Sequence, residues 1–142
     1  MGYIYAVIAG ACMSIQGVMN TRLSEKTGLF LSNAYVQGTA FILSLIILIF
    51  AKNNNFRGFA EVNKFYLFGG LFGIAITLTV MMAVKGTSPA VAVSAILVSQ
   101  LICAAVIDAF GIMGTEKVAF GWNKYAGAIL MIAGVIIFKS KT

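Results

Sequence analysis

The side chains of this chain that could do chemistry are few, and most of them are neutral. Among its 142 residues there is no histidine, there are only four acidic residues, and both cysteines, Cys12 and Cys103, fall inside apolar stretches. Metal centres and hydrolytic sites are built from clusters of histidine, cysteine and carboxylate side chains. The sequence therefore predicts a protein that is not an enzyme and that has neither a metal site nor a cofactor.

Carboxamide side chains form the most informative pattern. Gln16 and Asn20 lie four residues apart, as do Asn33 and Gln37, so each pair shares one face of a helix, and Gln100 lies in a later apolar stretch. Inside a bilayer each such group needs a partner or a water-filled cavity. Any single amide is equally well explained as a hydrogen bond between helices. Together they favour a polar cavity, and we expect Gln16, Asn20, Gln37 and Gln100 to face a substrate.

Asp108 is the one acidic residue within an apolar stretch. Partial burial would favour its protonated form, so that a proton and a substrate could compete for it. This hypothesis makes Asp108 a site of proton or cation coupling. The alternative is an interfacial carboxylate that pairs with Lys117, Lys124 or a group on a second subunit.

The elements that must position these groups are membrane helices. The chain is 61% hydrophobic and only 10% charged, with a mean hydropathy of +0.98, which leaves no polar surface for a water-soluble domain. Spanning hydrocarbon takes roughly 17 to 25 apolar residues, and the short connections favour antiparallel neighbours. We expect an all-α integral membrane protein, one membrane domain over residues 1–142, as a bundle of five transmembrane helices at about 3–21, 29–51, 65–84, 90–111 and 123–138.

Two local patterns bear on how these helices begin and pack. Ser88 followed by Pro89 is typical of a helix start, with a capping hydroxyl and then proline at the first helical position. Small residues recur at spacings of three or four residues in the first stretch, at Gly10, Ser14, Gly17 and Thr21. In later stretches we expect glycines to let helices approach closely, at Gly69, Gly73, Gly127 and Gly134.

Basic residues in short loops set the orientation of a membrane protein. If all five stretches span, the ten basic residues divide evenly between the two sides. The amino-terminal side carries Lys52, Arg57, Lys64, Lys117 and Lys124. The opposite side carries Arg22, Lys26, Lys85, Lys139 and Lys141. This balance gives insertion no preferred direction, so the sequence predicts dual topology.

The chain also resembles a known family of five-helix inner membrane exporters, the YdcZ family, over nearly its whole length. The resemblance rests on Gln16, Asn20 and Leu23, on Gly38, on Gly69, Gly70 and Gly73, and most specifically on Gln100, Asp108, Phe110 and Gly111. That family belongs to the drug/metabolite transporter superfamily, whose larger members repeat a five-helix unit twice in opposite orientations. The resemblance implies a bacterial inner membrane location and an antiparallel pair, formed by one dual-topology protein or by two oppositely oriented paralogues.

One departure from related exporters is informative. Small four-helix multidrug exporters carry an essential glutamate in their first helix, whereas this chain has neutral residues such as Gln16 there. A simple exchange of protons for a cation at that position is therefore not expected.

Five helices are few for alternating access, but two inverted copies give ten around a pseudo-two-fold axis. We therefore expect a small dual-topology secondary transporter, an exporter of a small polar metabolite or drug-like compound, that works as an antiparallel homodimer. Its partners would be a second copy of itself or an inverted paralogue, the lipid bilayer and the small substrate, with no nucleic acid. Two alternatives stay open, a dual-topology passive channel and a structural or regulatory half of a heterodimeric transporter.

Overall fold

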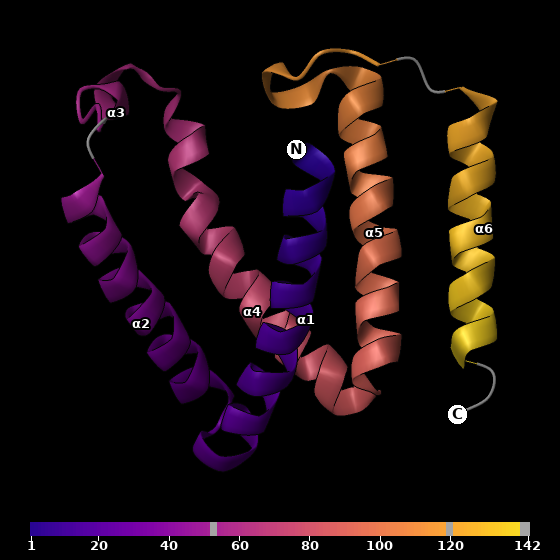
Figure 1. Cartoon of the computed structure of the whole chain (residues 1–142), viewed down its shortest axis with the longest axis horizontal. Helices are drawn as coiled ribbons and strands as arrows, with labels where there is room; N and C mark the ends of the chain where they lie inside the picture. The colour runs from indigo at the N-terminus through magenta and orange to yellow at the C-terminus, as the bar shows by residue number, and fades with distance from the viewer. Residues whose placement is uncertain (52–53, 119–120, 140–142) are drawn as a thin grey trace. The chain divides into compact units, whose positions relative to one another are not determined.

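The computed structural model describes residues 1–51, 54–118 and 121–139. Within these ranges every regular element is a helix (Figure 1). The chain divides into two compact units, Met1–Gly86 and Thr87–Thr142, and each is described by itself.

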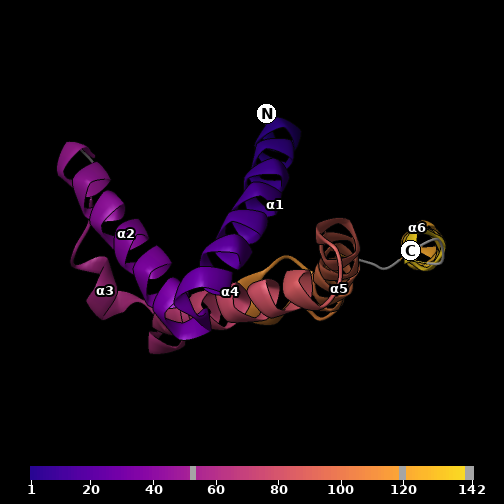
Figure 2. The ribbon, with the colours of Figure 1, turned by 90° about the horizontal axis from the view of Figure 1, so that it is seen from below.

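The first unit is built from three long helices, in which α1 packs against both α2 and α4, and α2 also packs against α4. A short helix and a 3-10 helix join α2 to α4. The bounds are α1 Gly2–Thr27, α2 Leu29–Phe50, α3 Gly58–Glu61, η1 Lys64–Phe68 and α4 Gly69–Gly86. Both views show α1 and α2 splaying apart from the turn that joins them (Figures 1 and 2).

The first helix is longer than expected, because α1 does not end near Thr21 but continues to Thr27. No glycine or proline occurs between Thr21 and Thr27, and Arg22 pairs with Glu25 one turn later at 3.2 Å. It ends at Gly28, whose φ of 87° lies in the region that favours glycine, and whose N–H donates to the carbonyl oxygen of Ser24 at 2.9 Å. A single residue therefore separates α1 from α2.

The longest connection of the first unit carries regular structure of its own. After α3, the side chain of Asn63 accepts a hydrogen bond from the backbone N–H of Phe65 at 3.0 Å and so caps η1. Since η1 runs directly into α4, the third apolar span covers Lys64–Gly86. Lys52 of this connection lies outside the described residues.

The second unit consists of α5 Pro89–Phe110, η2 Ile112–Gly114 and α6 Trp122–Lys139, and α5 packs against α6. Ser88 is the N-cap of α5 and Pro89 its first residue, as the sequence predicts, with Ser88 Oγ accepting from the N–H of Val91 at 3.4 Å. Gly111 ends α5 in the left-handed conformation, at φ 62° and ψ 36°. The fifth apolar stretch forms a helix of 18 residues, from Trp122 to Lys139.

Most large apolar side chains point outward. In the described part of the chain, five helices are long and apolar enough to cross a membrane, namely Gly2–Thr27, Leu29–Phe50, Lys64–Gly86, Pro89–Phe110 and Trp122–Lys139. Their surfaces expose phenylalanine, isoleucine and leucine almost throughout. Such surfaces suit hydrocarbon rather than water. The prediction of an all-helical protein with five apolar spans is confirmed.

Candidate functional site

The two amides predicted on the first span have different surroundings. Gln16 is exposed on α1, whereas Asn20, one turn further on, is only 8% exposed. The backbone carbonyl of Asn20 accepts a hydrogen bond from Ser32 Oγ on α2 at 3.3 Å. Asn20 therefore lies where α1 meets α2, and Gln16 lies on the open surface of α1.

Around Asn20 the first unit buries a group of polar side chains that the sequence did not single out as a site. Ser32 on α2 is fully buried, and its hydroxyl also lies 3.6 Å from the sulfur of Met81 on α4. Asn33, the next residue, is 9% exposed, and its side-chain oxygen Oδ1 has no hydrogen-bond partner among the described residues. The three helices thus meet around polar side chains from α1 and α2 and the buried Met81 from α4.

Two more hydroxyl side chains, both on α1, belong to this region. Thr21 is 3% exposed and donates from Oγ1 to the carbonyl oxygen of Gly17 at 2.7 Å. Ser24 is 7% exposed and donates from Oγ to the carbonyl oxygen of Thr21, also at 2.7 Å. Thr21 had a signal in the sequence as one of the regularly spaced small residues. Ser24 had none, because it follows the predicted end of the first span.

Gln37 on α2 makes a specific contact with α4. Its Nε2 donates to Thr77 Oγ1 at 3.2 Å, and Thr77 Oγ1 donates to the carbonyl oxygen of Gly73 at 2.9 Å. Both side chains are partly buried. The amide predicted to face a substrate is thus already engaged in a hydrogen bond between two helices.

The glycines differ in how closely another element approaches them. A Cβ atom added at Gly17 would lie 3.1 Å from Cγ1 of Val80, which is tighter than ordinary contact, and one added at Gly73 would lie 3.7 Å from Nε2 of Gln37. Gly69, Gly127 and Gly134 have open space at the corresponding position. Close helix packing is therefore observed at Gly17, and a packing role for the last three stays a prediction.

In the second unit Asp108 lines a groove between α5 and α6. The groove has a volume of about 290 Å³ and is also lined by Lys124, Gly127 and Met131. Asp108 is partly exposed. Its backbone carbonyl accepts a hydrogen bond from the N–H of Val118 at 3.0 Å, so the segment after η2 folds back onto the end of α5. Asp108 thus shares a groove with a lysine.

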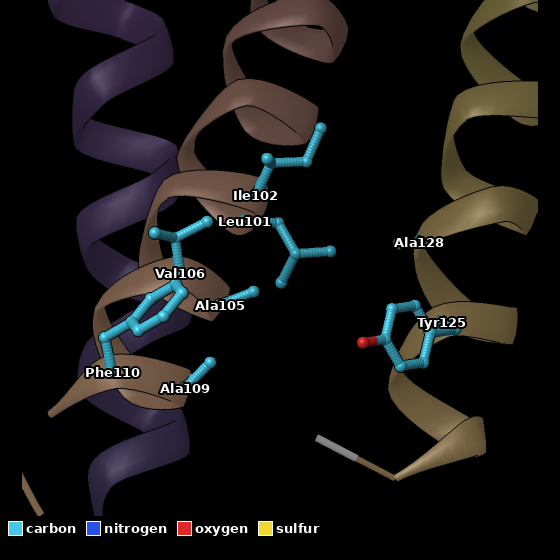
Figure 3. A pocket seen from close by; sticks show the side chains of 8 residues that line it. All are labelled: Leu101, Ile102, Ala105, Val106, Ala109, Phe110, Tyr125 and Ala128. Atoms are coloured by element: carbon cyan, nitrogen blue, oxygen red, sulfur yellow. The ribbon is translucent and has the colours of Figure 1, made fainter. Parts of the chain in front are cut away.

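A second groove between α5 and α6 is almost entirely apolar (Figure 3). Its volume is about 370 Å³, and α6 contributes Tyr125 and Ala128. The remaining lining residues come from α5, namely Leu101, Ile102, Ala105, Val106, Ala109 and Phe110. Figure 3 shows the hydroxyl oxygen of Tyr125 directed toward α5. This groove offers an apolar surface with one hydroxyl group.

Gln100 is exposed on α5, like Gln16 on α1. The structure therefore leaves two of the four predicted amides open on helix surfaces, buries Asn20 in the first unit and joins Gln37 to Thr77 by a hydrogen bond. Among the residues that the structure describes, no group of three or more histidine, cysteine, aspartate or glutamate side chains could hold a metal ion.

Residues 1–137 match the family model DMT_YdcZ, whose description reads "Putative inner membrane exporter, YdcZ". A search of curated proteins found no match to the chain, and a search of solved structures found none either.

Proposed function

Because the chain belongs to the YdcZ family of inner membrane exporters, we propose that it is a dual-topology secondary transporter that works by alternating access as an antiparallel dimer. Family membership and the five apolar spans make it a multi-pass protein of the inner membrane. The dual orientation, the dimer and the substrate are the proposed parts. We propose a small polar metabolite or drug-like compound as its substrate.

The equal division of basic residues carries the proposal. With each span crossing once, five lysine and arginine side chains fall on each side of the membrane, counting Lys52 and Lys141, which lie outside the described residues. Loops with an excess of these residues stay on the cytoplasmic side. A chain without such an excess is expected to insert in both orientations, which supplies the two halves of an antiparallel pair.

Exposed amides support a partner in the membrane. Gln16 on α1 and Gln100 on α5 are exposed on helices whose other exposed side chains are largely apolar. An unsatisfied polar group in contact with lipid costs free energy, so such groups normally face another helix or a water-filled cavity. A second copy in the opposite orientation would cover them, and the binding site of such an assembly lies near the bilayer midplane.

We assign Gln16, Asn20, Gln37 and Gln100 to substrate contact and Asp108 to coupling with a proton or another cation. Neutral amides both donate and accept hydrogen bonds, which suits a polar or zwitterionic compound. Asn20 and Gln37 would act within the first unit, close to their present partners. Asp108, with Lys124 lining the same groove, would bind the proton or cation, whereas Glu25, near the end of α1, already pairs with Arg22.

Topology is the first test, by labelling single cysteines in intact cells with a membrane-impermeant thiol reagent. Thr27→Cys and Asn54→Cys place one thiol before α2 and one after it, so the two sites lie on opposite faces when α2 spans. The background must lack Cys12 and Cys103, which are both exposed. Comparable labelling at both sites is the expected result, and labelling at one site alone would overturn dual topology.

Transport itself is tested in proteoliposomes that contain the purified full chain. The vesicles are offered a panel of radiolabelled amino acids, polyols and nucleosides, with and without an imposed proton gradient. A secondary transporter accumulates its substrate above the equilibrium concentration when the gradient is present, whereas a passive channel only equilibrates it. Equilibration of the substrate without accumulation would contradict the proposed transporter and support a passive channel.

A further inference from the structure

A long groove follows the contact between α5 and α6 in the second unit. Its first part is the groove of Asp108 and Lys124 described above. Its second part has a volume of about 280 Å³ and is lined by Ser94, Leu97, Val98, Gly134, Val135 and Phe138. Met131 lines both parts, so they follow one another along the helix pair, and we refer to them together as the long groove. Between Asp108 and Ser94 it extends about 21 Å along α5, at about 1.5 Å per residue.

The charged side chains of the long groove lie at one end. Asp108 lies in the last turn of α5, and Lys124 lies in the first turn of α6. Two aromatic residues mark the level of this end. Trp122 begins α6 and is 88% exposed, and the ring centroid of Tyr125 lies 6.2 Å from that of Trp122. Tryptophan and tyrosine concentrate where the hydrocarbon core meets the lipid head groups, so the charged end lies at the level of the head groups.

Beyond its charged end the long groove is apolar. Its lining side chains there are those of leucine, valine, methionine, phenylalanine and alanine, apart from two glycines and Ser94. Ser94 donates its hydroxyl proton to the carbonyl oxygen of Ala90 at 2.7 Å, so it offers no proton to a bound molecule. One leaflet contributes about 15 Å of hydrocarbon, and the long groove is longer than that. Its length and lining therefore suit a lipid acyl chain rather than a polar solute.

Two glycines keep the long groove open. Gly127 lines its first part and Gly134 its second. A Cβ atom added at either position would have no atom of another described element within 4 Å. The sequence predicts these glycines as places where helices approach closely, but in the described part of the second unit no other element comes that close. They leave room for a flexible chain along α6.

The charges at the head-group end select one class of lipid. A carboxylate and an ammonium group in one groove complement a zwitterionic head group, whose own ammonium group would meet Asp108 and whose phosphate would meet Lys124. An ethanolamine ammonium group has three N–H donors, as lysine has, whereas a choline group has none. An anionic lipid without an ammonium group would bring a second negative charge to Asp108. These charges favour phosphatidylethanolamine over phosphatidylcholine and phosphatidylglycerol.

From these observations we propose that the long groove binds one molecule of phosphatidylethanolamine. Its phosphate would contact Lys124, its ammonium group would contact Asp108, and one acyl chain would run past Gly127 and Gly134. Basic pockets between transmembrane helices bind lipid head groups in other membrane proteins. The proposal concerns one chain and requires neither the antiparallel pair nor transport.

Native mass spectrometry of the full chain tests the head group. The protein, purified in a mild detergent, is supplied with equal amounts of dioleoyl phosphatidylethanolamine, phosphatidylcholine or phosphatidylglycerol, and the lipid that it retains is counted. We expect phosphatidylethanolamine to bind about three- to tenfold more tightly than phosphatidylcholine, as one charge-assisted hydrogen bond near the surface would give. Equal retention of all three lipids would overturn the proposal.

Two charge variants should give different signatures. Asp108→Asn should bring the affinities for phosphatidylethanolamine and phosphatidylcholine close together, because the carboxylate that binds the ammonium group is gone, and it should raise the affinity for phosphatidylglycerol. Lys124→Gln should weaken the binding of all three lipids, since each carries a phosphate, and should keep phosphatidylethanolamine ahead of phosphatidylcholine. An undiminished preference for phosphatidylethanolamine in Asp108→Asn contradicts the assignment of the head group.

Gly127→Leu tests the position of the acyl chain. A leucine side chain would fill the long groove and should reduce the retention of all three lipids. Ala133→Leu is the matched control, because Ala133 is exposed on the same helix and is not among the described residues that line the long groove. This control should retain as much lipid as the unchanged chain. Gly134→Leu makes the same test further along the groove if Gly127→Leu does not fold.

Unchanged retention in both glycine variants would overturn the proposal. Loss of a dimer in place of the lipid, which the same spectra report, would also overturn it, because a helix of a second copy would then be the occupant. Asp108 has a separate proposed role in coupling, which uptake driven by a pH gradient measures. Because the readout here is bound lipid, failure of lipid binding leaves the proposed transport standing, and failure of the transport assay leaves lipid binding standing.

Discussion

Gln37 on α2 and Thr77 on α4 are joined by a hydrogen bond of 3.2 Å between Nε2 and Oγ1. The two residues are 40 positions apart in the sequence, and their side chains join two apolar helices. In a bilayer an apolar side chain gains little free energy by exchanging lipid for contact with another helix. Helix pairs are therefore stabilised by hydrogen bonds such as this one and by close backbone contact. Gln37 therefore holds α2 against α4 in the structure, beside the substrate role proposed for it.

Removing this bond should lower stability by a measurable amount. We expect Gln37→Leu and Thr77→Val each to reduce the free energy of unfolding by about 0.6 to 1.7 kcal/mol, the range of hydrogen bonds between membrane helices. The double variant should cost less than the sum of the two, because both remove the same bond. Unfolding in mixed micelles measures these values. Thr79→Val, whose hydroxyl bonds only within α4, should change stability by less than about 0.5 kcal/mol. Full additivity would show that the bond contributes nothing.

Gly17 should resist substitution more than Gly10, although both lie on α1. A Cβ atom at Gly17 would approach Cγ1 of Val80 to 3.1 Å, and valine in a helix has little freedom to turn away. A Cβ atom added at Gly10 would have no atom of another described element within 4 Å. We expect Gly17→Ala to be less stable than Gly10→Ala by about 1 to 3 kcal/mol, the usual cost of overpacking, measured by the same unfolding assay. Adding Val80→Ala should restore most of the loss, and equal stability of the two alanine variants would contradict the close contact.

Asp108 should matter for coupling rather than for folding. If it binds a proton during transport, Asp108→Asn should lose uptake driven by a pH gradient while the folded protein remains, as measured in proteoliposomes and by Tm. Glu116→Gln is the control, since Glu116 follows the end of α5 and lies outside the spans. Full uptake driven by pH in Asp108→Asn would dispose of the coupling role and favour an interfacial carboxylate paired with a lysine.

Removing one lysine from either side of the membrane should shift the orientation of the chain, in opposite directions for the two sides. Lys64→Gln leaves four basic residues on the amino-terminal side against five, and Lys85→Gln leaves five against four, from the assignment of five to each side. Since the more basic side stays cytoplasmic, the two variants should shift the labelled fraction of the Asn54 site in opposite directions. The labelling of intact cells described above measures both. A fraction that does not respond to either change would mean that the charge balance does not set the orientation.

Local sequence patterns predicted the elements better than their ends. Ser88 and Pro89 begin α5 because a capping hydroxyl and a proline act through the backbone of one turn. The end of α1 lies later than the sequence predicts, because the polar residues after Thr21 are typical of a connection. Their hydrogen bonds and the pair of Arg22 with Glu25 are compatible with a helix, and the chain turns only at Gly28.

The polar residues of the candidate site could be named from the sequence, but their surroundings could not. Gln16 and Asn20 share a predicted face, yet one is exposed and the other is buried beside Ser32. A helix in lipid is apolar on every side, so no contrast between a polar and an apolar face shows which side meets a neighbour. For the same reason the sequence does not show that Ser32 and Asn33 are buried.

The sequence by itself determined that this is an all-helical membrane protein with five apolar spans, because length and hydropathy alone decide what can cross a bilayer. It also determined the family, through residues 1–137. Only the tertiary structure decided that Gly17 rather than Gly69 receives a neighbouring side chain and that Asn33 Oδ1 is buried with no hydrogen-bond partner among the described residues. Those outcomes depend on where splayed helices cross, which is a matter of packing between distant segments and not of any local pattern.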